Sequence, residues 1–164
     1  MRLLIPSAEE LRQALVIGAA VWRSPDRACE DDAAPPPIVL QRALENIAAH
    51  PDFSAWFSPR LFWVPDIGSI VGSGRFKRLP DHPQGVEIGY GVGGRFQGRG
   101  YATAGVQLMI AEAFARPEIN ELVATAKPDN LASIRVLEKC GFVPSPERPG
   151  IEDRMYQRFH LRRA

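Results

Sequence analysis

Residues 86–101 read Val86-Glu-Ile-Gly-Tyr-Gly-Val-Gly-Gly-Arg-Phe-Gln-Gly-Arg-Gly-Tyr101 and lead from a predicted strand, through a glycine-rich loop, into a predicted helix. Within the loop, Arg95, Gly98 and Gly100 form an R-x-x-G-x-G pattern directly before the helix. Glycines at these positions let backbone N–H groups point into a concavity, and the positive end of the helix adds to its attraction for anions. Because Arg95 and Arg99 can contribute positive charge, the segment is typical of a pyrophosphate-binding turn.

Two other interpretations of this segment stay open. Gly89, Gly91 and Gly94 satisfy G-x-G-x-x-G, the fingerprint of dinucleotide-binding proteins. These glycines, however, lie inside the strand and before the loop, and no acidic residue ends a second strand at the expected distance. The other interpretation is that the glycines only ease a tight connection between strand and helix. No G-K-[S/T] sequence follows the loop, which excludes a nucleoside-triphosphate P-loop.

The composition of the 164-residue chain is that of one globular domain, with 45% hydrophobic and 24% charged residues. Its 20 Lys and Arg residues against 19 Asp and Glu leave a net charge of +1, which argues against nucleic acid as a partner. No apolar run approaches the roughly 18 residues of a membrane span, so no membrane partner is expected. Cys29 and Cys140 are too few for a disulfide framework, and His50, His82 and His160 show no metal-ligand spacing. We therefore expect a metal-free protein of the reducing cytoplasm.

Apolar periodicity and turn residues predict a mixed α/β domain with a central sheet, a single domain over residues 1–164. Ser7, with Glu10 three positions later, forms a capping-box pattern that opens a predicted helix extending to about Ala19. The Pro-, Asp- and Ala-rich segment 22–37 is predicted as a loop. Further helices are predicted at 38–49, 101–115 and 130–140. Strands are predicted at 1–6, 61–65, 69–76, 86–92, 121–126, 142–145 and 154–161, the second and third of them as a hairpin.

Three motifs carry a resemblance to a known family. They are Glu87-Ile-Gly-Tyr90 on a strand, Arg95-Phe-Gln-Gly-Arg-Gly-Tyr-Ala102 at the start of a helix, and Asn130-Leu-Ala-Ser-Ile-Arg-Val-Leu-Glu-Lys-Cys-Gly-Phe142 further on. In order and spacing they resemble the GNAT superfamily of N-acetyltransferases, especially its branch that acetylates ribosomal proteins and protein N-termini. The resemblance covers about residues 61–159, and before them only the presence of two helices. It implies a single-domain GNAT fold with a mixed, mostly antiparallel central sheet, flanking helices and splayed central strands.

The resemblance also implies where acetyl-CoA would bind. In this family the cosubstrate lies in a V-shaped opening between two parallel strands that splay apart, here 86–92 and 121–126. The loop amides of residues 97–101 would hold the pyrophosphate, and the backbone of residues 91–93 would pair with the pantetheine arm. Backbone donors near Tyr90 would stabilise the oxyanion that forms on the thioester. The cosubstrate-binding residues implied in this way are Tyr90, Gly91, Val92, Gly93, Arg95, Gln97, Gly98, Arg99, Gly100, Tyr101, Ala102, Asn130 and Ser133.

Glu87 is the candidate general base. A charged residue inside a strand of a buried sheet needs a reason, and Glu87 matches the position of the family's catalytic glutamate. An amine acceptor is largely protonated at neutral pH, with a reference pKa of about 7.7–8.0 for a protein N-terminus and about 10.4 for lysine. A group must therefore remove a proton before the amine attacks the thioester. The structural alternative is an ion pair of Glu87 with Arg75 or Lys77 on the neighbouring strand.

The second motif offers a candidate acid with a structural alternative at each position. Asn130 is a good N-cap for the helix that follows, and the resemblance adds a contact to the pantetheine or to bound water. Many members of the family carry a tyrosine further along this helix that protonates the CoA thiolate, and here that position holds Leu137. Ser133 is the hydroxyl that remains, with water or Tyr101 as other options, and a surface serine without a catalytic role is the alternative.

The sequence thus predicts an acetyl-CoA-dependent N-acetyltransferase whose amine acceptor attacks the thioester directly in a ternary complex. The resemblance favours a protein N-terminus or a peptide amine, in a groove left open by a short turn at 146–153. Two alternatives stay open: a small-molecule acceptor such as an antibiotic, polyamine or amino acid, and a catalytically silent acyl-CoA-binding module. The acceptor walls would come from segment 22–37 and the early helices. Family likeness also suggests a homodimer.

Overall fold

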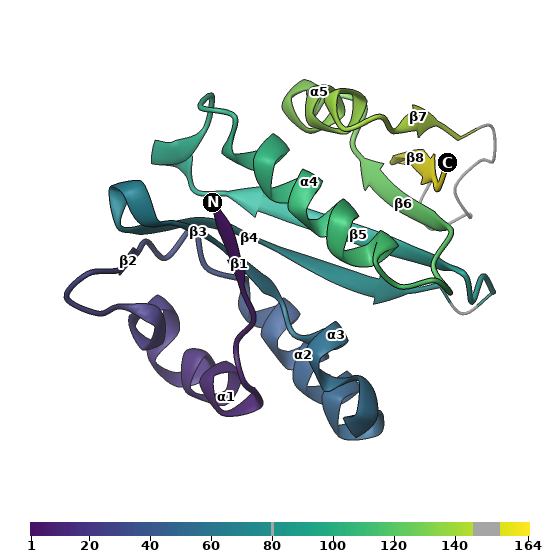
Figure 1. Cartoon of the computed structure of the whole chain (residues 1–164). Helices are drawn as coiled ribbons and strands as arrows, with labels where there is room; N and C mark the ends of the chain where they lie inside the picture. Colours follow the sequence, from purple (N-terminus) through teal and green to yellow (C-terminus); the bar gives the residue numbers. More distant parts are fainter. Residues whose placement is uncertain (80, 146–154) are drawn as a thin grey trace. The chain divides into compact units, whose positions relative to one another are not determined.

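The computed structural model of the chain describes residues 1–79, 81–145 and 155–164 (Figure 1). Its helices are α1 (Ala8–Ile17), α2 (Pro37–Ala49), α3 (Ser54–Phe57), α4 (Tyr101–Phe114) and α5 (Leu131–Lys139), with short 3₁₀ turns that include η1 (Gly18–Trp22) and η4 (Gly94–Phe96). Its strands are β1 (Arg2–Leu4), β2 (Ala28–Cys29), β3 (Arg60–Val64), β4 (Ser69–Arg78), β5 (Gly85–Val92), β6 (Glu121–Ala126), β7 (Val143–Pro144) and β8 (Gln157–Arg162).

The backbone divides into two compact units, and each unit consists of two segments of the chain. Unit 1 holds Met1–Phe76 and Tyr90–Leu108, and unit 2 holds Lys77–Gly89 and Met109–Ala164. Strands β4 and β5 and helix α4 each continue from one unit into the other.

Unit 1 is built on antiparallel pairing in the order β1-β3-β4. The two-residue strand β2 lies parallel to β4, with Cys29 opposite Ile70. Side chains from α1, η1, α2 and these strands share one apolar cluster, which includes Leu11, Trp22, Leu40, Leu61 and Ile70. Burial of a large apolar side chain contributes roughly 1.5–3 kcal/mol, so this cluster fixes the two early helices on the strands of unit 1.

Helix α1 begins where the capping-box pattern predicts. The Ser7 hydroxyl accepts a hydrogen bond from the Glu10 N–H at 3.2 Å, and the Glu10 carboxylate accepts one from the Ser7 N–H at 2.8 Å. The helix ends at Ile17 instead of the predicted Ala19 because Gly18 takes a φ of 63° with a ψ of −146°, a combination that only glycine adopts readily.

Unit 2 contains strands in the order β5-β6-β8-β7. Strands β6 and β8 pair antiparallel along all of their length, from Glu121 opposite Arg162 to Ala126 opposite Gln157. Helix α5 contacts β6, and the buried side chains of this unit include Leu122, Leu137, Phe142 and Phe159.

Strand β5 runs parallel to β6, which makes the sheet mixed. The register joins Gly85, Val86 and Glu87 to Glu121, Leu122 and Val123. After these pairs β5 continues with Ile88 and β6 with Ala124, and across the described residues the two strands pair no further. This early end of the pairing agrees with the predicted pair of splayed parallel strands.

Most predicted elements are confirmed, and the differences concern short segments. Segment 22–37, predicted as a loop, contains β2, which is too short to show an apolar alternation. The four-residue helix α3 was not predicted, because four residues carry no helical period. The last strand begins at Gln157 and not at residue 154. The predicted short turn at 146–153 lies outside the described residues.

Candidate functional site

The predicted phosphate-binding turn lies in unit 1, between the end of β5 and the start of α4 (Figure 1). Gly98 and Gly100 have φ values of 73° and 81°, in the left-handed region that favours glycine. A Cβ added to either residue would meet no atom within 4 Å, so the space beside the turn is open. In the part of the chain that the structure describes, the amides of residues 98–101 donate to no protein group. Since α4 begins at Tyr101, these four donors lie at the positive end of its dipole.

Residues just before the turn make hydrogen bonds that hold its backbone in place. The Gly93 N–H donates to the Val71 carbonyl of β4 at 3.0 Å, and the Gln97 N–H donates to the Gly94 carbonyl at 3.3 Å. The Gln97 side chain also donates to the Val92 carbonyl at 3.2 Å. Because the Gln97 amide is already bonded, the donors available to an anion begin at Gly98.

The backbone at the end of β5 directs its polar groups alternately to two edges. Successive residues of a strand direct their backbone groups to opposite edges, and Gly93 bonds to β4. Val92 and Tyr90 therefore direct theirs away from β4. A Cβ on Gly91 would meet nothing within 4 Å. These features fit the predicted pairing with an extended chain such as pantetheine, which stays a prediction.

The aromatic and charged residues of the turn have defined contacts. Phe96 is buried and meets the half-buried Tyr101 ring edge-on, with 6.3 Å between ring centroids. The Arg95 guanidinium lies 5.0 Å from the centre of the Phe96 ring and donates to the Glu30 carboxylate at 2.6 Å. Arg95, predicted to bind the cosubstrate, is therefore held by a carboxylate of the protein itself, while Arg99 is exposed.

Glu87 lies on β5 in unit 2, and its side chain is 20% exposed. One carboxylate oxygen pairs with the Lys77 ammonium at 3.2 Å, and the other accepts from the Thr125 hydroxyl at 3.5 Å. The ion pair with Lys77 is the structural alternative that the sequence offered. It leaves room for a catalytic role, because a carboxylate has more lone pairs than these two contacts use.

Thr125 is a neighbour of Glu87 that the sequence reasoning missed. It lies on β6 two positions beyond Val123, which is opposite Glu87 in the last pair of the β5–β6 register. Residues two apart on a strand face the same side, so Thr125 could be identified as a neighbour of Glu87 only once the register of β5 and β6 was known.

Helix α5 carries the second motif, and its first residue is fixed locally. The Asn130 side chain accepts from the Ser133 N–H at 3.1 Å, which confirms the predicted N-cap. Contact of Asn130 with the cosubstrate stays a prediction. Ser133 is half-buried, whereas Leu137, at the family's tyrosine position, is completely buried.

Among the described residues, the cysteines and the side chains that could bind a metal form no second candidate site. Burial raises the pKa of the Cys29 thiol to about 11 and also raises that of Cys140, whereas nucleophilic cysteines need a lowered pKa. Among the described residues, no cluster of three or more His, Cys, Asp or Glu side chains is arranged to bind a metal ion. Within the same residues, no helix combines the length and apolar character that crossing a bilayer requires.

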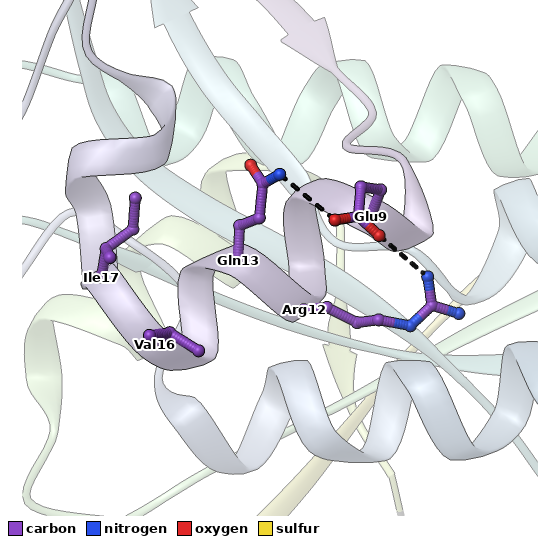
Figure 2. A pocket seen from close by; sticks show the side chains of 5 residues that line it. All are labelled: Glu9, Arg12, Gln13, Val16 and Ile17. Atoms are coloured by element: carbon purple, nitrogen blue, oxygen red, sulfur yellow. Dashed lines mark hydrogen bonds and ion pairs between the residues drawn. The ribbon is translucent and has the colours of Figure 1, made fainter.

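A surface hollow on α1 is lined by none of the predicted site residues. It is lined by Glu9, Arg12, Gln13, Val16 and Ile17. Glu9 accepts from Arg12 at 3.3 Å and from Gln13 at 3.2 Å, and Figure 2 shows the aliphatic Val16 and Ile17 further along the helix. The hollow therefore adds no group to the chemistry of the turn.

Comparison with known proteins identifies the family that has this arrangement. A family model described as an acetyltransferase (GNAT) domain matches residues 8–143. The chain belongs to the GNAT acetyltransferase family. The match includes the glycine-rich turn, Glu87 and helices α1 to α5, and it confirms the predicted family and fold class. Acetyl-CoA is the acyl donor that GNAT proteins use.

Curated GNAT relatives match about half of the chain. The uncharacterised N-acetyltransferase YjdG of Bacillus subtilis (strain 168) is 34% identical over 74 residues, which are 45% of this chain and 44% of that protein. The uncharacterised N-acetyltransferase p20 of Bacillus licheniformis is 29% identical over 79 residues, which are 48% of this chain and 44% of that protein. The matches therefore span less than half the length of each of these relatives.

Solved GNAT structures share the fold along almost the whole chain. A ribosomal-protein-alanine N-acetyltransferase from Brucella melitensis aligns with a TM-score of 0.63 at 17% identity, over 99% of both chains. A variant of the spermidine N-acetyltransferase of Vibrio cholerae aligns with a TM-score of 0.63 at 15% identity, over 99% of this chain and 95% of that one. An aminoglycoside acetyltransferase in complex with coenzyme A has a TM-score of 0.63 at 16% identity, over 98% and 94%. At these identities the likeness establishes the GNAT fold alone.

Proposed function

We propose that the chain transfers the acetyl group of acetyl-CoA to a primary amine. The observation that carries the proposal is the open turn at the start of α4, in a domain of an acetyltransferase family. Four available amides at a helix N-terminus suit the pyrophosphate of CoA. A side chain at Gly98 or Gly100 would occupy the space beside these amides, so the two glycines are part of the fit.

The proposed reaction follows the residue roles that the family resemblance implies. Bound acetyl-CoA supplies an activated acyl group, which the amine nitrogen attacks directly in a ternary complex. Glu87 takes the proton of the amine, directly or through water, while Lys77 and Thr125 hold its two oxygens. Backbone donors near Tyr90 stabilise the negative charge that develops on the carbonyl oxygen. Ser133, a water molecule or Tyr101 supplies the proton that the departing CoA thiolate takes up.

For the acceptor we propose a protein N-terminus or another peptide amine. The support is the order and spacing of the sequence motifs, together with a fold shared with a ribosomal-protein-alanine N-acetyltransferase. A small-molecule amine is the second candidate, because spermidine and aminoglycoside acetyltransferases share the fold to the same degree. A catalytically silent acyl-CoA-binding module is the third, and turnover on any amine would dismiss it.

The first test is calorimetric titration of the purified chain with acetyl-CoA, with NAD as the comparison ligand. We expect acetyl-CoA to bind and NAD not to bind, and Gly98→Glu to abolish binding by placing a carboxylate beside the amides. An acceptor screen by release of free thiol follows, over peptides, polyamines and aminoglycosides, with Glu87→Gln as the low-turnover control. Binding of NAD without binding of acetyl-CoA would contradict the proposal.

A further inference from the structure

We propose that Glu30 and Asp32, which lie in the segment 30–33 named here the strap, act as positioning residues that hold the phosphate-binding turn in its binding shape. The inference rests on the proposed function, because it assigns the strap a role in acetyl-CoA affinity. The Asp32 carboxylate accepts from the Gly94 N–H at 2.7 Å, across 62 positions of sequence. The Glu30 carboxylate pairs with the Arg95 guanidinium at 2.6 Å, across 65 positions. Two successive residues of the turn are thus held from one short segment.

The strap also packs closely against the turn. A Cβ added to Gly93 would lie 2.8 Å from an Asp32 carboxylate oxygen and 3.2 Å from the Ala33 Cβ. Gly93 has a φ of −57°, which any residue can adopt. The backbone therefore does not require glycine here, and the absence of a side chain is needed only for the close approach of the strap. Ala33 is only 2% exposed. Small residues on both sides therefore make this contact possible.

Strand β4 holds the strap and the turn in register. Residues just before the strap form β2, which pairs with β4 at Ser69 and Ile70. The next residue of β4, Val71, accepts the hydrogen bond of the Gly93 N–H. The strap itself is closed by a hydrogen bond from the Ala33 N–H to the Glu30 carbonyl at 3.1 Å. Neighbouring residues of one strand thus fix both segments.

The charge of Asp32 and its hydrogen bond with Gly94 would have opposite effects on the affinity for a pyrophosphate. A negative charge close to an anion-binding turn weakens anion binding, whereas a fixed Gly94 amide strengthens it by keeping the turn in shape. Substitution by asparagine keeps an oxygen acceptor and removes the charge, and substitution by alanine removes both. The sign of the change in affinity therefore separates positioning from electrostatics.

The test is calorimetric titration of acetyl-CoA into the full chain and its Asp32 variants. We expect Asp32→Ala to raise the Kd about tenfold, the scale of one charge-assisted hydrogen bond, and Asp32→Asn to bind at least as tightly as the unaltered chain. In turnover, Asp32→Ala raises the KM for acetyl-CoA and leaves the kcat at saturation within about twofold, a split that general loss of stability would not produce. Equal effects of the two substitutions, or unaltered binding by a folded Asp32→Ala, would overturn the inference.

Asp31→Asn is the matched control. It removes the same charge from the neighbouring position, but Asp31 pairs with Arg23 at 3.0 Å and its side chain is 87% exposed. We expect its affinity for acetyl-CoA to equal that of the unaltered chain. Amide exchange at Gly94 gives a readout without ligand: it quickens in Asp32→Ala and stays slow in Asp32→Asn.

A double-mutant cycle tests Glu30 and Arg95. The pair is exposed, so it stabilises the fold little and its role is orientation. If Arg95 acts through the strap, Glu30→Ala, Arg95→Ala and the double variant weaken acetyl-CoA binding equally. Additive losses, with the larger one at Arg95, would show direct phosphate contact and overturn this part. If the unaltered chain does not bind acetyl-CoA, the proposed function is rejected as well. If it binds acetyl-CoA and none of the substitutions changes the affinity, only the role of the strap is rejected.

Discussion

Gly98 combines two properties, a positive φ and an open space beside it, and one substitution affects both. Its φ of 73° is strained for other residues, and the space beside it is open. We expect Gly98→Ala to lower the free energy of unfolding by about 1 kcal/mol and also to weaken acetyl-CoA binding, because the methyl group enters the space beside the amides. Urea unfolding and calorimetry measure the two effects.

Gly18→Ala is the control for strain. Gly18 also has a positive φ, 63°, with no atom within 4 Å of an added Cβ, but it lies at the end of α1. The substitution should reduce stability at least as much, because the ψ of −146° at Gly18 is open to glycine almost alone, and should leave the affinity for acetyl-CoA unaltered. A comparable loss of affinity in both variants would mean that Gly98 matters only for the fold.

The candidate base gives a second prediction at the residue scale. We expect Glu87→Gln to lower kcat by about 10²- to 10⁴-fold, the usual contribution of general base catalysis, with acetyl-CoA binding retained. Thr125→Ala should lower kcat less, because it removes only one hydrogen bond to the carboxylate. Thiol release at saturating acetyl-CoA measures both. A Glu87→Gln variant with undiminished kcat would leave Glu87 as the ion-pair partner of Lys77 only.

At the scale of elements, the start of α1 depends on one reciprocal contact. Ser7→Ala removes the side-chain acceptor of the Glu10 N–H, and loss of such a cap costs about 1 kcal/mol. We expect the urea midpoint to fall accordingly while the KM for acetyl-CoA stays the same. Arg12→Ala, which breaks an exposed pair with Glu9 on the same helix, should have a smaller effect; an equal effect would contradict the capping argument.

The first pair of the β5–β6 register carries a pH-sensitive contact. Glu121, opposite Gly85, accepts from Arg162 at 3.1 Å and pairs with His82 at 2.7 Å. Burial alone would raise the pKa of Glu121, but the hydrogen bonds from Arg162 and His82 outweigh it and leave the pKa below its ordinary value of 4.5. A lowered pKa means that the folded state favours the carboxylate, so this stabilisation is present above pH 4.5 and is lost as the pH falls through the lowered pKa.

Glu121→Gln tests this contact. We expect the variant to be less stable at neutral pH and to show a flatter decline of stability below about pH 5 than the unaltered chain. Urea unfolding at a series of pH values measures the two slopes. Parallel pH profiles would show that Glu121 does not contribute to the acid sensitivity of unit 2.

Local signals in the sequence account for much of the fold and for part of the site. The Ser7–Glu10 capping box and the glycines of the turn act within a few residues, so their consequences could be predicted. The strap could not, since Asp32 and Gly94 are 62 positions apart and a hydrogen bond of that span leaves no period in the sequence. Thr125 was missed for the same reason, because its neighbour Glu87 lies on another strand.

At the scale of the whole molecule, the three tryptophans give a test of cooperativity. Trp22, Trp56 and Trp63 all lie in unit 1, whereas helices and strands of both units contribute to circular dichroism. We propose that residues 1–164 unfold as one domain, because β4, β5 and α4 continue through both units. Tryptophan fluorescence and far-UV circular dichroism should then report one thermal midpoint.

Two separated midpoints would contradict the single domain. Repeating the measurement at two protein concentrations also tests the expected homodimer, because a midpoint that rises with concentration indicates a folded state stabilised by association. A concentration-independent midpoint would favour a monomer.

The path of the chain through its two units limits how the protein can be cut. The chain passes between the units three times, after Phe76, after Gly89 and after Leu108. Any continuous fragment that contains a whole unit therefore also contains a segment of the other unit. That segment lacks the rest of its own unit. Truncation by itself therefore cannot yield either unit alone, and a cut at any of the three crossings would fall inside β4, β5 or α4.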